Sequence, residues 1–158
     1  MAQHEPQRDD PASLPLDDQD FRDQAEFRAA LRRFIHFSEE QARARGLTPQ
    51  QHQLLLAIRG HSQYPQVSIG DVAAALRIRH HSASLLVDRS VKRDLLYRRE
   101  DENDRRRALV SLTPEGQKSL DAITRANRRQ MQSLRGAFFG ETLWQALLDY
   151  ERGEEDTM

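Results

Sequence analysis

Three helix-start signals divide the middle of this 158-residue chain, and their spacing restricts its fold more than any other feature. Each signal has a hydroxyl side chain that can accept a hydrogen bond from a backbone amide three residues later: Thr48 before Pro49, Ser68 before Ile69, and Thr113 before Pro114. They predict a helix from 49 to about 60, a short helix from 69, and a long helix to about 135. The chain is therefore expected to be mainly helical, with one domain or one domain with added helices.

The segment between the second and third signals has the pattern of a turn, a helix and a hairpin. A brief turn at 77–79 separates the short helix from a second one at about 80–93. The runs 95–100 and 107–112 read as strands, and the polar sequence 101–106 joins them as a hairpin. Two short helices, a tight turn and a hairpin make a winged helix-turn-helix, which we place at 47–112.

Helical patterns on both sides of this domain predict helices that pair two copies of the chain. Apolar residues recur on one face of 20–45, and 113–150 holds the long helix and a final one at about 141–150. A hydrophobic fraction of 37% suits a subunit that completes its core by oligomerising. We expect a mainly α fold with a small β-hairpin wing and with N- and C-terminal dimerisation helices. The expected dimerisation residues are Phe27, Leu31, Phe34, Leu134, Phe138, Leu143, Trp144 and Leu147.

Charge is distributed unevenly along the chain. Residues 1–20 hold one arginine against six acidic residues, and 151–158 hold one against four, so the total of −1 leaves +7 for 21–150. Within that body, 77–107 carries a net +4. We interpret 1–19 as a disordered acidic tail and 151–158 as a second acidic tail. A basic body between acidic tails suits a nucleic-acid binder, although a solvated mixed surface explains the charge as well.

Several classes of protein are excluded by what the sequence lacks. It has no cysteine, which rules out disulfides, thiolate zinc sites and a thiol redox switch. No apolar run approaches ~18 residues and the N-terminus does not resemble a secretory signal, so we expect a cytoplasmic protein without a membrane span. Neither a nucleophile elbow nor a glycine-rich phosphate loop is present, so we expect no enzyme and no cofactor.

The second helix of such a motif lies in the major groove of double-stranded DNA, and this chain has suitable side chains there. The hairpin tip is rich in arginine, which the narrow minor groove attracts. We expect Asp104 to orient one of these arginines through a bidentate pair. The expected DNA contacts are Arg77, Arg79, His80, His81, Ser82, Ser84, Leu85 and Arg89 in the recognition helix and its turn, and Arg105, Arg106 and Arg107 in the wing.

The stretch from Leu47 to Gly116 resembles the multiple-antibiotic-resistance regulator (MarR) family of bacterial repressors. The similar segments are LTPQQHQLLLAI, SIGDVAAAL, RIRHHSASLLVDR and, most specifically, DENDRRRALVSLTPEG. The resemblance implies a homodimer that reads a pseudo-palindrome and represses its own or neighbouring genes. It also implies, for many members, release from DNA by a small aromatic or phenolic molecule bound between the dimer helices and the DNA-binding domain.

Three residues depart from the family's pattern. Arg77 and Asp94 stand where the family favours glycine, and a left-handed backbone there costs a non-glycine residue about 1 kcal/mol. Ser90 stands where a buried leucine is usual, a loss of ~2 kcal/mol of apolar burial unless the helix rotates to bury Val91 instead.

Other interpretations of single residues remain open. His80 and His81 are adjacent on a helix and poorly placed to share a metal ion, so we expect no metal site, and His36 with Glu40 suits a surface pair. Trp144, Phe138 and Phe139 suit a dimer core better than an effector pocket. Three functions compete: a ligand-responsive repressor, a DNA-binding regulator without an effector, and a winged helix that contacts other proteins.

Overall fold

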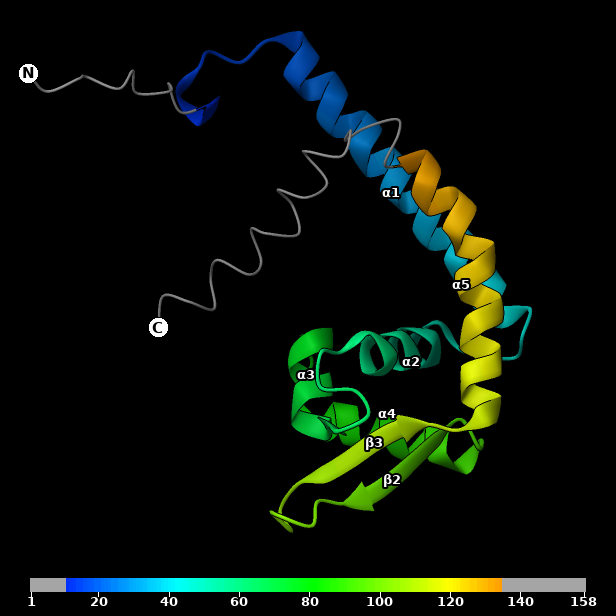
Figure 1. Ribbon diagram of the computed structural model, residues 1–158. Coiled ribbons are helices and arrows are strands. Elements are labelled where there is room, and N and C mark those ends of the chain that lie inside the picture. The colour runs from blue at the N-terminus through cyan, green and yellow to red at the C-terminus, as the bar shows by residue number, and fades with distance from the viewer. Residues whose placement is uncertain (1–10, 135–158) are drawn as a thin grey trace, which may run out of the picture.

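A two-helix arm and a lobe make up residues 11–134, the part of the chain that the computed structural model describes (Figure 1). The arm consists of α1 (Asp18–Arg43) and α5 (Pro114–Leu134), which lie side by side. The lobe follows α1 and contains α2 (Pro49–Gly60), β1 (Val67–Ser68), α3 (Ile69–Leu76), α4 (His80–Lys92), β2 (Leu96–Glu100) and β3 (Ala108–Leu112). The expected mainly α fold with a wing is confirmed.

The ends of α1 are set by local signals. A 3-10 turn, η1 (Pro11–Ser13), precedes Asp17, whose carboxylate caps the helix in a capping box with Asp20. The helix thus starts two residues before the expected boundary at 20. Gly46 stops it as predicted: with φ +74°, it donates from its amide to the Arg43 carbonyl at 2.9 Å.

The lobe is built as the helix-start signals predict, with one added strand. Thr48 and Ser68 both form complete capping boxes, with Gln51 and Asp71. The hairpin strands begin one residue later than expected, and β1 joins them in an antiparallel sheet of order β1-β3-β2. We did not predict β1, because two residues are too short to show alternation. Ser68 pairs with Leu109 of β3.

A single apolar core fills the lobe and receives side chains from the arm. Its fully covered members include Leu54, Leu55 and Ile58 of α2 and Val110 of β3. Ile123 of α5 belongs to the same core, so the arm is anchored in the lobe. Burial of this kind contributes roughly 1.5–3 kcal/mol for each large apolar side chain.

The join between the lobe and α5 is one residue long. Thr113 separates β3 from α5; its amide donates to the Leu95 carbonyl at 3.1 Å, and its hydroxyl accepts from the Gly116 amide at 3.0 Å. A Cβ atom on Gly116 would lie 2.1 Å from the Leu95 carbonyl oxygen. Only glycine allows this close approach, so α5 starts against the beginning of the wing.

The arm leaves apolar side chains exposed in a single chain. Ile35 is 50% exposed and Phe21 61%, while Leu31, an expected dimerisation residue, is 36% exposed. The expected residues Phe27, Phe34 and Leu134 are half-buried. The final helix at 141–150 and the other expected dimerisation residues lie outside the described residues: Phe138, Leu143, Trp144 and Leu147.

The three departures from the family's pattern all have structural consequences. Arg77 and Asp94 both take the left-handed backbone that favours glycine, with φ +52° and +57°. Ser90 is fully buried and Val91 half-buried, so the helix has not rotated. The Ser90 hydroxyl donates to the Leu86 carbonyl at 2.9 Å, which satisfies its polar group within the helix.

Candidate nucleic-acid interface

The turn before α4 and the packing of its inner face determine which face of this helix is exposed. The turn at 77–79 follows α3, whose last carbonyls accept from the amides of Arg77 (3.1 Å) and Ile78 (3.0 Å). The inner face of α4 then buries Ala83, Val87 and Ser90 in the lobe. This leaves the opposite face of the helix outward.

The outward face of α4 carries most of the side chains expected to contact DNA. Ser84 is half-buried, while the rest of that set is exposed: Arg77, Arg79, His80, His81, Ser82, Leu85 and Arg89. Arginine, histidine and serine can donate to phosphate or to base edges, and Leu85 can contact a thymine methyl group. Within residues 11–134, no cluster of side chains suits a metal ion.

Asp88 connects α4 to the wing. Its carboxylate accepts from the Arg98 guanidinium of β2 in a short contact, and both side chains are partly exposed. No local pattern in the sequence indicates this pair, because ten residues and a change of element separate the partners. The pair links β2, the first strand of the wing, to α4.

The wing is a regular hairpin that projects from the lobe (Figure 1). Its turn closes through two backbone hydrogen bonds, from the Asp101 amide to the Arg107 carbonyl at 3.0 Å and from the Arg107 amide to the Asp104 carbonyl at 2.9 Å. The tip therefore has a defined conformation before any partner binds.

Arg106 is held in the forked pair that the sequence predicts. Its Nε lies 3.2 Å from Asp104 Oδ1, and its second terminal nitrogen 3.5 Å from Asp104 Oδ2. Hydrogen bonds from the Arg106 side chain and backbone lower the pKa of Asp104 below its usual value. The Arg106 side chain is nevertheless 91% exposed, so its charge faces outward while the pair with Asp104 favours one direction of the guanidinium.

Arg107 has different surroundings from its neighbour. Its guanidinium lies between two carboxylates, with NH1 3.5 Å from Asp101 Oδ2 and NH2 3.8 Å from Asp71 Oδ2. These partners come from the wing turn and from the first turn of α3. Nothing in the linear sequence indicates this bridge, because Asp71 precedes Arg107 by more than thirty residues.

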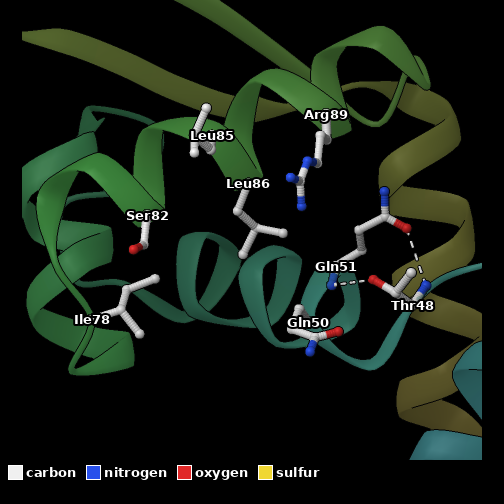
Figure 2. A pocket seen from close by; sticks show the side chains of 8 residues that line it. All are labelled: Thr48, Gln50, Gln51, Ile78, Ser82, Leu85, Leu86 and Arg89. Atoms are coloured by element: carbon white, nitrogen blue, oxygen red, sulfur yellow. Dashed lines mark hydrogen bonds between the residues drawn. The ribbon is translucent and has the colours of Figure 1, made fainter.

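A hollow of about 470 Å³ separates α4 from the start of α2 (Figure 2). Thr48 and Gln51 lie on one side, where each accepts a hydrogen bond from the other's backbone amide. Leu86 and Arg89 approach from α4 on the other side. The complete lining is Thr48, Gln50, Gln51, Ile78, Ser82, Leu85, Leu86 and Arg89.

The lobe matches the model of the MarR family over residues 45–107. This segment belongs to the MarR family. Members of this family are transcription regulators and not enzymes. None of the curated protein sequences compared with the chain matches it.

Solved structures with the MarR fold extend the likeness to the arm. Bordetella bronchiseptica BpsR, studied for regulation of its DNA binding by 6-hydroxynicotinic acid, has 26% identity and a TM-score of 0.60, over 84% of this chain and 98% of that one. The S. aureus MepR–DNA complex has 23% identity and a TM-score of 0.65, over 84% and 96%. YusO from Bacillus subtilis has 21% identity and a TM-score of 0.58, over 90% and 100%.

The helices and hairpin predicted from the sequence are those of the MarR fold, and the resemblance to the family is confirmed. The roles of individual side chains remain predictions. No helix among residues 11–134 is both long and apolar enough to cross a membrane.

Proposed function

We propose that this chain is a sequence-specific transcription regulator that binds a pseudo-palindromic operator as a homodimer and represses its own or neighbouring genes. The observation that carries the proposal is the pre-aimed wing: Arg106 is held by Asp104, yet 91% of its side chain is exposed. An outward guanidinium whose direction is favoured by a carboxylate suits insertion into a narrow minor groove. The exposed face of α4 would occupy the adjacent major groove.

Exposed apolar side chains on the arm support the proposal that two copies of the chain pair and bind two half-sites. The exposed Leu31 and Ile35 of α1 would otherwise remain in water. A second copy that covers them would place two lobes so that each reads one half-site about ten base pairs from the other. We therefore propose 20–45 and 113–150 as dimerisation segments, and 47–112 as the DNA-binding domain.

The first test is titration of the protein onto DNA flanking its own gene, with excess nonspecific competitor at ~150 mM salt. Nanomolar binding by one dimer per site supports the proposal. Binding that disappears with competitor would leave only a nonspecific basic surface at that DNA. Replacement of Arg106 by Ala should weaken operator binding by ~1–3 kcal/mol, while Arg59→Ala, a change at an exposed arginine of α2 outside the proposed DNA contacts and dimerisation segments, should not.

We further propose release from DNA by a small aromatic acid bound in the hollow of Figure 2. Ile78, Leu85 and Leu86 offer an apolar wall. The Arg89 guanidinium can pair with a carboxylate. This hollow lies within the lobe rather than between the arm and the lobe, where the family resemblance implies a pocket. Because α4 forms one wall of this hollow, a molecule bound there would directly affect the helix face that we propose contacts DNA.

6-Hydroxynicotinic acid is a rational first probe, because BpsR is similar to this chain at 26% identity. Release of bound operator and a raised melting temperature of the free protein would support the ligand site. Replacement of Leu86 by Phe should fill the hollow and abolish both effects, whereas Leu56→Phe, on an exposed part of α2, should leave them intact. Undiminished operator binding with every aromatic acid tried would favour a regulator without an effector.

A further inference from the structure

Arg107 is linked to two fixed carboxylates rather than being directed into solvent. Its side chain is 48% exposed, against 91% for Arg106 beside it. It stands one residue before β3, where the hairpin leaves its turn. From there its guanidinium reaches both the wing turn and α3, at 3.5 and 3.8 Å.

The α3 side of this bridge is held rigidly. Asp71 Oδ2 accepts from both the amide and the hydroxyl of Ser68, each at 2.8 Å. Burial acts to raise the pKa of Asp71, but the Ser68 hydrogen bonds and the charges of His61 and Arg107 outweigh it and lower the pKa. Asp71 is therefore an ionised anchor fixed by its role as a helix cap.

The wing side is held as well. Asp101 is only 8% exposed, and its Oδ1 accepts from the Asn103 amide at 2.9 Å. The Asp101 amide donates to the Arg107 carbonyl, so the two residues are joined by both backbone and side chain. If Arg107 turned away, a nearly buried carboxylate would lose its cation.

We propose that Arg107 is a positioning residue that locks the wing against α3 and so sets where Arg105 and Arg106 meet the minor groove. This inference rests on the proposed function for its effect on DNA, but not for the lock itself. The planar guanidinium suits the task, because its separate N–H groups can face two carboxylates at once. Partly exposed ion pairs add little to global stability, so the lock acts on local order of the wing.

Hydrogen–deuterium exchange of the free protein tests the lock without DNA. In Arg107→Gln, the amides of Asp101, Asn103 and Arg107 should exchange on the order of tenfold faster, because the wing opens locally, while the α5 amides stay unchanged. The matched control is Arg105→Gln, because Arg105 lies on the same turn, whereas Arg107 is the residue that pairs with Asp71 and Asp101. Equal exchange in the two variants would overturn the proposal.

Operator binding then separates positioning from direct contact through a double-mutant cycle. Arg107→Gln should weaken binding about tenfold in the unmodified protein, but less than about twofold in an Arg105→Ala/Arg106→Ala background, because it acts through those side chains. Equal weakening in both backgrounds would mean that Arg107 contacts DNA itself, and the proposal would fail.

Arg107→Lys provides a second measurement that keeps the positive charge. A lysine can still neutralise a phosphate, but its compact ammonium cannot span the two carboxylates as a guanidinium does. We expect it to bind operator as weakly as Arg107→Gln, and full affinity would overturn the proposal. If the unmodified protein shows no operator preference, the proposed function fails, while the exchange measurement still decides whether the lock exists.

Discussion

In a single chain, the apolar side chains and polar groups of the lobe are more completely buried and paired than those of the arm. In the lobe, the large apolar side chains of α2 and the sheet are buried, and α2 and α3 both have closed capping boxes. In the arm, Phe21 and Ile35 are at least half exposed, and the buried Asn127 donates to Ser38 while its own Oδ1 has no partner among the described residues. A single chain thus covers the apolar core of the lobe, with Ile123 of the arm inside it, but leaves apolar side chains of the arm exposed.

The largest effect is expected where the two regions meet. Replacement of Gly116 by Ala would place a methyl group against the Leu95 backbone carbonyl, which cannot move without distorting the start of the wing. We expect a loss of about 3 kcal/mol in the free energy of unfolding, measured by urea denaturation. The control is Gly60→Ala, where an added Cβ meets nothing within 4 Å; a similar loss there would contradict this reading of the join.

A charge on the arm should break pairing and leave the lobe intact. Ile35→Asp would put a carboxylate in the surface that we propose a second copy covers, which should weaken dimerisation by about 2 kcal/mol or more. Sedimentation equilibrium gives the dimer constant directly. Leu56 of the lobe is 47% exposed, close to the 50% of Ile35, so Leu56→Asp is the matched control. Equal weakening by both changes would show that the arm is not the pairing surface.

Relief of backbone strain should make the lobe more stable. Asp94 has φ +57° at the end of α4, so Asp94→Gly should raise the free energy of unfolding by about 0.5–1 kcal/mol. Gly46→Ala should do the reverse, because it forces a side chain into the same conformation at φ +74°. Thermal unfolding of both variants checks the pair of opposite shifts, and two shifts of the same sign would refute the strain argument.

The smallest effect is expected at the buried serine. Ser90→Ala removes a hydroxyl that bonds only within its own helix, and alanine favours helix slightly more. The two terms nearly cancel, so the free energy of unfolding should change by less than about 0.5 kcal/mol. A loss above about 1 kcal/mol in calorimetry would mean that the hydroxyl has a further role in the lobe.

The sequence could predict those structural features that depend on residues close together in the chain. Examples are the capping boxes at Thr48 and Ser68 and the forked pair of Asp104 with Arg106. Each joins residues two or three apart, so a short sequence pattern indicates it. The bridge from Asp71 to Arg107 and the hollow beside α4 arise from packing between distant segments, and no local pattern encodes them. β1 escaped prediction for a related reason, since two residues become a strand only when β3 pairs with them.

The one-residue join at Thr113 has a mechanical consequence. With its amide on Leu95 and Gly116 pressed against the same carbonyl, the start of α5 and the base of the wing cannot rotate independently. The two behave as one lever, with 21 residues of helix as its long arm, about 30 Å at 1.5 Å per residue. A rotation of ~5° about this pivot displaces the far end of α5 by about 3 Å, a length comparable to one base-pair step. Conversely, we expect a displacement imposed on the arm to reach the wing as a change of angle.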